Sequence, residues 1–144
     1  MGAACDHVSD RSEAQDWKGK VVLLDFWASW CGYCIDGFQK IKQMKEDEGA
    51  PDLQVISIDT DEPSAMEAAR RVVASHDMPW PKVMSGKGLN DTAWMVFQGL
   101  DHSLPLYVLI DRDSIVRYSG AGGENLEELR GATEKYTGNP KIVK

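Results

Sequence analysis

The amino-acid sequence predicts an α/β fold with a central mixed sheet of four or five strands, flanked by helices on both faces. The first observation behind this prediction is that short apolar runs of strand formers alternate with segments whose apolar residues recur at helical spacing. The second is that these runs contain few polar residues, which is typical of strands covered on both sides. The third is that the last two strand-like segments lie close enough in the chain to pair as an antiparallel hairpin.

The first half of the chain predicts a strand, a helix and a second strand. Residues 21–27 are an almost wholly apolar run of strand formers, and residues 54–59 form a second run. Between them, residues 31–48 carry an apolar side chain at every third position and end at a Gly-Ala-Pro sequence that stops a helix. The helical stripe consists of Ile35, Phe38, Ile41 and Met44. The crossover between the two strands should be right-handed.

The second half predicts two helices, a hairpin and a final helix. Residues 61–75 open with two acids and a proline, which suit the positive end of a helix. A short helix is expected over 89–98, followed by strands over 106–110 and 115–119 and a last helix over 124–136. The side chains expected to face inward from the first helix are Met66, Ala69, Val72 and Val73. Those expected to face inward from the short helix are Leu89, Ala93, Val96 and Phe97.

Length and composition indicate one globular domain. The chain has 144 residues, of which 42% are hydrophobic and 27% charged, and its formal net charge is −7. Binding to nucleic acid or to an anionic membrane surface needs clustered Lys and Arg, so neither is an expected partner. The longest apolar runs fall far short of the roughly 20 residues that span a bilayer. Residues 1–16 are polar and aperiodic, so we expect a flexible N-terminal segment followed by a folded domain over 17–144.

Two of the three cysteines form a C-x-x-C sequence where the first strand gives way to the first helix. The free N–H groups and the dipole of a helix N-terminus favour a thiolate over a thiol, and can lower a cysteine pKa from about 8.5 to roughly 3.5–7.5. We therefore expect Cys31 to be the exposed nucleophile and Cys34, one turn deeper, to be the resolving thiol. Cys5 stands alone near the N-terminus.

Other interpretations of the cysteine pair are open from the residues alone. A structural zinc site would need two more Cys or His ligands at short spacing, and the three histidines are scattered along the chain. A copper-binding metallochaperone could use Cys31, Cys34 and His102. A peroxide-reducing redoxin would place a threonine three residues before its reactive cysteine, and neither cysteine of the pair has one.

Residues 22–34 read V-L-L-D-F-W-A-S-W-C-G-Y-C. This segment resembles the active-site segment of the thioredoxin superfamily, and the long stretch over 62–104 is similar to the extra segment of the TlpA/ResA-like redoxins. The resemblance covers about residues 17–136. It implies a thioredoxin fold and a thiol–disulfide oxidoreductase that exchanges a Cys31–Cys34 disulfide with protein substrates, as a reductase or isomerase. It also implies a membrane or soluble electron donor and no metal or organic cofactor, and we expect a monomer.

The resemblance also assigns roles around the cysteines. Asp25 matches the buried acid of thioredoxins, where it would take the proton from Cys34; the alternative is a solvated acid at a strand edge. TlpA/ResA-like proteins usually carry Asn there, and Pro where this chain has Tyr33. The Gly32-Tyr33 dipeptide, shared with DsbC-type isomerases, would tune the stability of the thiolate.

Three further residues are implied in substrate binding. Trp30 would lie partly exposed beside Cys31, where an aromatic ring helps to hold a peptide. Pro105 matches the cis-proline of the family, although a trans bond is the commoner state of an X-Pro peptide. Leu104, before that proline, would then offer its backbone to a substrate strand.

The start of the sequence lacks the basic and apolar regions of a signal peptide. Two interpretations follow: a cytoplasmic protein, or an exported one whose signal or anchor is missing from this sequence. The resemblance favours a periplasmic or otherwise extracytoplasmic location.

Overall fold

The computed structural model describes residues 19–47, 53–88, 92–97, 103–122 and 126–137. The predicted N-terminal segment, Cys5 and His102 lie outside these ranges. The elements, in chain order, are β1 (Val21–Trp27), α3 (Gly32–Asp47), β2 (Leu53–Asp59), the 3-10 turn η1 (Pro63–Ala65), α4 (Met66–Ser75), β3 (Lys82–Val83), α5 (Thr92–Phe97), β4 (Leu106–Ile110), β5 (Val116–Ala121) and α6 (Leu126–Thr137).

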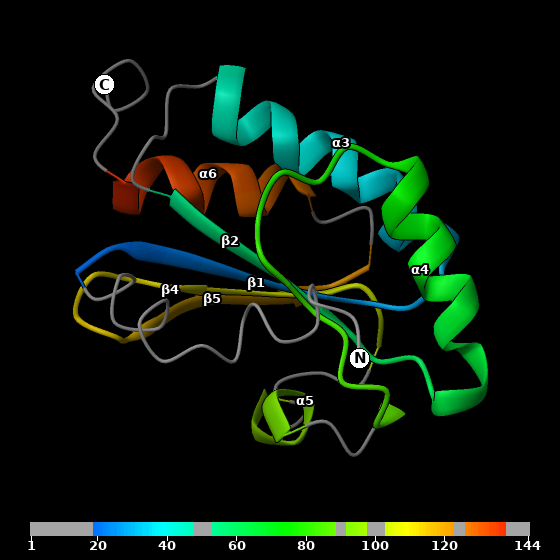
Figure 1. The fold of residues 1–144 in the computed structure, drawn as a ribbon. Coiled ribbons are helices and arrows are strands. Elements are labelled where there is room, and N and C mark those ends of the chain that lie inside the picture. The colour runs from blue at the N-terminus through cyan, green and yellow to red at the C-terminus, as the bar shows by residue number, and fades with distance from the viewer. Residues whose placement is uncertain (1–18, 48–52, 89–91, 98–102, 123–125, 138–144) are drawn as a thin grey trace.

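The sheet is mixed, as the sequence predicts, and β1 lies at its centre. Its strand order is β3-β2-β1-β4-β5 (Figure 1). β1 pairs parallel with β2 and antiparallel with β4, and β5 closes the predicted hairpin with β4. In this register Asp25 lies between Ser57 on β2 and Tyr107 on β4. Three side chains from distant parts of the sequence therefore share one level and one face of the sheet.

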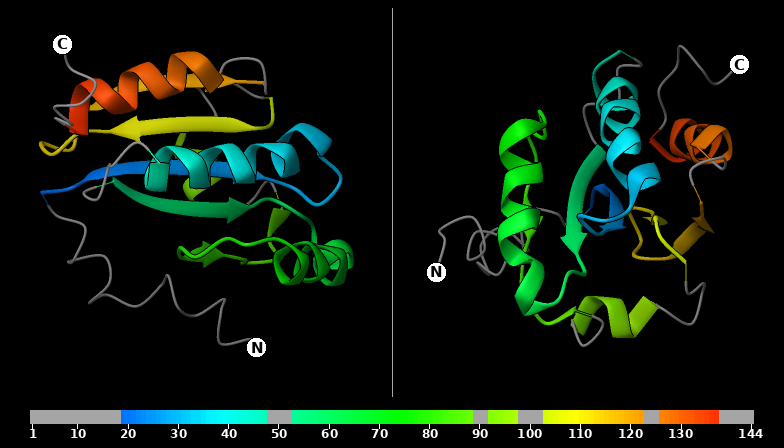
Figure 2. Two further views of the ribbon diagram at one scale, coloured as in Figure 1. Left: turned by 90° about the horizontal axis from the view of Figure 1, so that it is seen from above. Right: turned by 90° about the vertical axis from the view of Figure 1, so that its right-hand side faces the viewer.

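Helices cover both faces of the sheet. Figures 1 and 2 show α3 and α6 side by side over one face and α5 on the other. The alternation along β1 follows these layers, because Leu23 and Trp27 belong to the cluster under α3 whereas Leu24 and Phe26 belong to the cluster under α5. Asp25 thus points to the α3 face, beneath the helix that carries the cysteines.

Two expectations about local structure are corrected. The short strand β3 lies in a region for which the sequence predicts no strand; it pairs parallel with β2 at the edge of the sheet. On α5, Val96 is 67% exposed instead of inward, and Trp94 is buried in its place. Trp94 and Phe97 pack on Phe26, with ring centroids 5.6 and 6.2 Å away, and so set which side of this one-and-a-half-turn helix faces the sheet.

The other helices follow the predicted pattern with small changes at their ends. The helix expected from residue 61 opens with the 3-10 turn η1 before α4, and Pro63 occupies the first position of that turn, where its missing N–H leaves no bond unmade. Phe38, Ile41 and Met44 of α3 are buried, as are Met66 and Ala69 of α4. None of the helices in the described ranges is both long and apolar enough to cross a membrane.

Candidate active site

The two cysteines lie at the N-terminus of α3 and are joined by a disulfide with a Cα–Cα distance of 5.2 Å. Cys31 directly precedes the helix, and Cys34 lies in its first turn. The backbone N–H of Cys34 donates a hydrogen bond of 3.1 Å to Cys31 Sγ. This is one of the free donors at a helix start, so the same contact would stabilise negative charge on that sulfur once the disulfide is reduced.

The exposure of the sulfurs differs from the sequence expectation. Cys31 keeps 6% of its accessible surface, and Cys34 is fully buried. The freely exposed nucleophile expected at Cys31 is therefore mostly covered in the disulfide form, because the residue packs into the cluster under α3. Cys31 is still the more exposed residue of the pair.

The loop between β1 and Cys31 is fastened to the end of β2. Asp61 is buried, and its carboxylate accepts two hydrogen bonds from Ser29, one from the backbone N–H at 2.8 Å and one from the hydroxyl at 2.9 Å. The backbone N–H and hydroxyl of Thr60 both donate to the Trp27 carbonyl, at 2.8 and 3.0 Å. These bonds fix the backbone that leads into Cys31.

Asp25 is fully buried, which excludes the solvated strand-edge alternative. Its Oδ2 accepts a hydrogen bond of 2.7 Å from the Ser57 hydroxyl. Burial raises the pKa of Asp25 from 3.8 to about 7, and the Ser57 hydrogen bond acts in the opposite direction. An acid with this pKa can both accept and release a proton near neutral pH.

Tyr107 lies on the other side of Asp25 and reaches α3. Burial, with the charge of Asp25 adding to it, raises the pKa of Tyr107 above its usual range, so the phenol stays neutral. A Cβ at Gly37 would overlap the Tyr107 hydroxyl. The absence of a side chain at this position of α3 is what admits the tyrosine ring.

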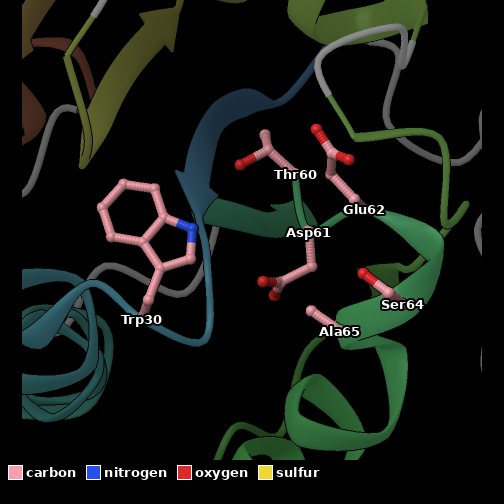
Figure 3. A pocket seen from close by; sticks show the side chains of 6 residues that line it. All are labelled: Trp30, Thr60, Asp61, Glu62, Ser64 and Ala65. Atoms are coloured by element: carbon pink, nitrogen blue, oxygen red, sulfur yellow. The ribbon is translucent and has the colours of Figure 1, made fainter.

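The surface next to the cysteines is aromatic. Trp30 is 72% exposed and Tyr33 is 66% exposed, on either side of Cys31 in the sequence, and Gly32 between them is also exposed. Beside Trp30 lies a pocket of about 310 Å³ (Figure 3). Its lining consists of Trp30, Thr60, Asp61, Glu62, Ser64 and Ala65.

The loop before β4 contains the predicted proline. The Leu104–Pro105 peptide bond is cis, the state that the family resemblance implies. Pro105 is buried, and its carbonyl accepts a hydrogen bond of 2.9 Å from the N–H of Gly122. Leu104 is half-buried and packs against the clusters on both faces of the sheet.

Comparison with known proteins decides the family. A family model described as Redoxin matches residues 3–135. The chain belongs to the Redoxin family. This Redoxin is 29% identical to the thiol-disulfide oxidoreductase ResA of Bacillus cereus over 125 residues, which cover 87% of this chain and 68% of that protein. It is 32% identical to the thioredoxin-like protein YneN of Bacillus subtilis, over 56% of this chain and 48% of YneN.

Solved structures agree. A candidate thiol:disulfide interchange protein DsbE from Chlorobium tepidum matches the Redoxin chain with a TM-score of 0.66 and 28% identity, over 83% of this chain and 84% of that one. StoA from Bacillus subtilis has a TM-score of 0.60 at 16% identity, over 81% and 84% of the two chains, which is a likeness of fold. Together with the Cys31–Cys34 disulfide, these relatives identify a thiol–disulfide oxidoreductase with a thioredoxin-like fold.

The structure adds residues to the site of this Redoxin that the sequence does not reveal. Ser57 and Tyr107 flank Asp25. Asp61, which holds the loop before Cys31, is not one of these added residues, because its place directly after the second predicted strand already puts an acid near Cys31. Alternation along β2 and β4 marks Ser57 and Tyr107 as facing the α3 side, but the strand register is needed to bring them to Asp25. Among the described residues, no group of three His, Cys, Asp or Glu side chains is arranged to hold a metal ion.

Proposed function

We propose that this Redoxin reduces or isomerises disulfides in protein substrates through its Cys31–Cys34 pair, in an extracytoplasmic compartment. The observation that carries the proposal is the disulfide at the start of α3, in which Cys31 Sγ accepts the Cys34 N–H and Cys31 is the more exposed of the two cysteines. A sulfur stabilised as a thiolate, with a second thiol one turn away, is the arrangement that thiol–disulfide exchange needs.

The exchange proceeds in two displacements. The Cys31 thiolate attacks one sulfur of a substrate disulfide; an S–S bond forms between them, and the other substrate sulfur leaves as a thiolate that takes a proton from solvent. Cys34 then gives its thiol proton to Asp25 and attacks Cys31 Sγ, which breaks the bond to the substrate. The second substrate sulfur leaves with that electron pair as a thiolate and takes a proton from solvent. Two electrons pass from the dithiol to the substrate, and the enzyme is left with the Cys31–Cys34 disulfide.

Asp25 is the proton acceptor of the second displacement in this proposal. Its burial beneath α3 and its pKa of about 7 support the role, because an acid close to neutrality is ionised often enough to accept the Cys34 proton. Burial disfavours the charged form of Asp25, so the step in which the ionised acid takes the Cys34 proton is favourable for the acid.

Substrate binding falls to the surface around Cys31. Trp30 and Tyr33 provide exposed aromatic rings for an unfolded or peptide-like substrate, and the backbone of Leu104, before the cis-proline Pro105, offers an edge for strand-like pairing. Gly32 and Tyr33, between the cysteines, tune the stability of the thiolate.

The proposal includes a thiol electron donor, membrane-bound or soluble, that restores the dithiol after each turnover. Similarity to ResA and to the DsbE-like structure supports an extracytoplasmic location. We propose that the folded domain over 17–144 acts as a monomer.

Trapping the mixed disulfide tests the proposal. A Cys34→Ser variant should accumulate a covalent complex with a denatured protein that keeps its disulfides, because the second displacement is blocked. Both variants carry Cys5→Ser as well, and the matched Cys31→Ser variant should form no complex, since its remaining thiol, Cys34, is buried. Both species are measured by mass spectrometry under non-reducing conditions. Equal trapping by the two variants, or none by Cys34→Ser, would contradict the assigned roles.

A further inference from the structure

A chain of three hydrogen-bonded groups ends on the buried acid. Trp80 Nε1 donates a hydrogen bond of 2.8 Å to Ser57 Oγ, and Ser57 Oγ donates one of 2.7 Å to Asp25 Oδ2. All three side chains are buried. Trp80 lies in the segment between α4 and β3, 23 residues beyond Ser57 in the sequence, so the fold brings this chain together.

The chemistry of the donors gives the chain a direction. An indole N–H can only donate, so Ser57 Oγ must accept from Trp80. With one lone pair engaged in this way, the serine hydroxyl proton points to Asp25 Oδ2, as the 2.7 Å contact shows. The other carboxyl oxygen, Oδ1, has no hydrogen-bond partner among the residues that the structure describes.

The other groups around Asp25 do not supply a competing donor. Tyr107 flanks it from β4 and keeps its phenol proton, but its hydroxyl makes no hydrogen bond to any of the residues that the structure describes. Cys34 lies above the same face in the first turn of α3 and is engaged in the disulfide. Asp59 is buried two residues farther along β2, where one of its oxygens accepts the backbone N–H of Asp61.

We propose that Ser57, oriented by Trp80, is a positioning residue that keeps the proton of the Asp25 carboxyl on Oδ1. Retention of both hydrogen bonds leaves Oδ2 occupied as an acceptor, so the acid gains and loses its proton at Oδ1. The inference rests on the proposed role of Asp25 as proton acceptor. It adds that Trp80 and Ser57 determine which carboxyl oxygen exchanges the proton. Their hydrogen bonds also stabilise the ionised form of Asp25.

The test is the titration of Asp25 in the oxidised protein, monitored by the NMR chemical shift of its carboxyl carbon. Ser57→Ala removes a donor to the ionised acid, so the Asp25 pKa should rise by about one unit, a tenfold change in its acid constant. Ser57→Thr keeps the hydroxyl and should restore the wild-type value. Trp80→Phe frees the serine hydroxyl to turn away, so the pKa should rise by less than in Ser57→Ala.

A second measurement guards against a variant that fails to fold. In the wild-type protein the indole N–H resonance of Trp80 should shift with the same midpoint as Asp25, because Ser57 connects the two groups. The indole shift should lose this midpoint in Ser57→Ala. In the reduced enzyme, the pH profile of substrate release should move upward with the Asp25 pKa in that variant.

The outcomes separate this inference from the proposed function. An unchanged Asp25 pKa in Ser57→Ala overturns the positioning role, and an unchanged value in Trp80→Phe overturns the part assigned to the indole. Both results can be obtained without any turnover. Failure of Cys34→Ser to trap a substrate, with the Asp25 shifts as expected, would instead count against the exchange reaction while leaving the hydrogen-bond chain intact.

Discussion

Replacing Asp25 with Asn should make the oxidised protein more stable, and by an amount that depends on pH. The buried acid has a pKa of about 7 in the folded chain, against 3.8 for an ordinary aspartate. Below about pH 4 both folded and unfolded chains hold the proton, and the group contributes no difference. Between the two pKa values the unfolded chain releases its proton while the folded chain keeps it, so stability falls as pH rises.

The size of the effect follows from the shift. A difference of about three pKa units, at about 1.36 kcal/mol per unit, amounts to about 4 kcal/mol once the pH exceeds the folded pKa. Asn has nearly the same shape, keeps an acceptor for the Ser57 hydroxyl and carries no proton to lose. Asp25→Asn should therefore match the wild type near pH 4 and exceed its free energy of unfolding by about 4 kcal/mol near pH 8.

Urea unfolding of the oxidised protein at several pH values measures this difference. Asp36→Asn removes an exposed carboxyl from α3 and controls for the loss of one negative charge. The reasoning is refuted if Asp25→Asn changes stability equally at every pH, or if its advantage grows as the pH falls. Substrate release by the reduced variant should be slowed, since the proton acceptor is gone.

Three more predictions concern packing and binding. Gly37→Ala should destabilise the protein by about 1–3 kcal/mol because its Cβ meets the Tyr107 hydroxyl. In a Tyr107→Phe background the same change should stabilise it by about 0.5–1 kcal/mol, since Ala is the better helix former; denaturation of all four chains checks the reversal of sign. Asp61→Ala should lower the free energy of unfolding by about 3 kcal/mol, because it removes both hydrogen bonds from Ser29. Ser29→Ala removes only the hydroxyl bond and should lower it by about half as much; thermal unfolding measures both. Trp30→Ala should leave stability within about 0.5 kcal/mol but lower kcat/KM about tenfold for a denatured disulfide-bonded protein, with no such loss for a small aromatic disulfide.

The main strands and the cysteine helix could be predicted because their signals are local and strong. β1 and β4 have the expected bounds, and α3 differs from its expected range by one residue at each end. β3 could not be foreseen, since two residues carry no periodicity and their strand character comes from pairing with β2. The helix α5 has only six residues, so its sequence pattern cannot decide whether Val96 or Trp94 faces the sheet.

The site shows the same division. The C-x-x-C pair and the burial of Asp25 follow from neighbouring residues, because a helix start and an apolar run can be recognised in a short stretch of sequence. The partners of the acid cannot be found this way. Ser57 lies 32 residues from Asp25, and Trp80 a further 23, so strand register and a loop path decide that they meet. Likewise the covering of Cys31 depends on the packing of the whole α3 face.

The recessed position of Cys31 limits what this Redoxin can attack. Cys31 keeps 6% of its accessible surface, whereas Trp30 and Tyr33, which stand beside it in the chain, are 72% and 66% exposed. Displacement at sulfur requires the attacking and leaving atoms to line up, so a partner disulfide must come within bonding distance of a residue that the fold largely covers. Under the proposed exchange, a disulfide in a flexible or unfolded segment can adapt to this approach, whereas one held in a rigid folded surface cannot.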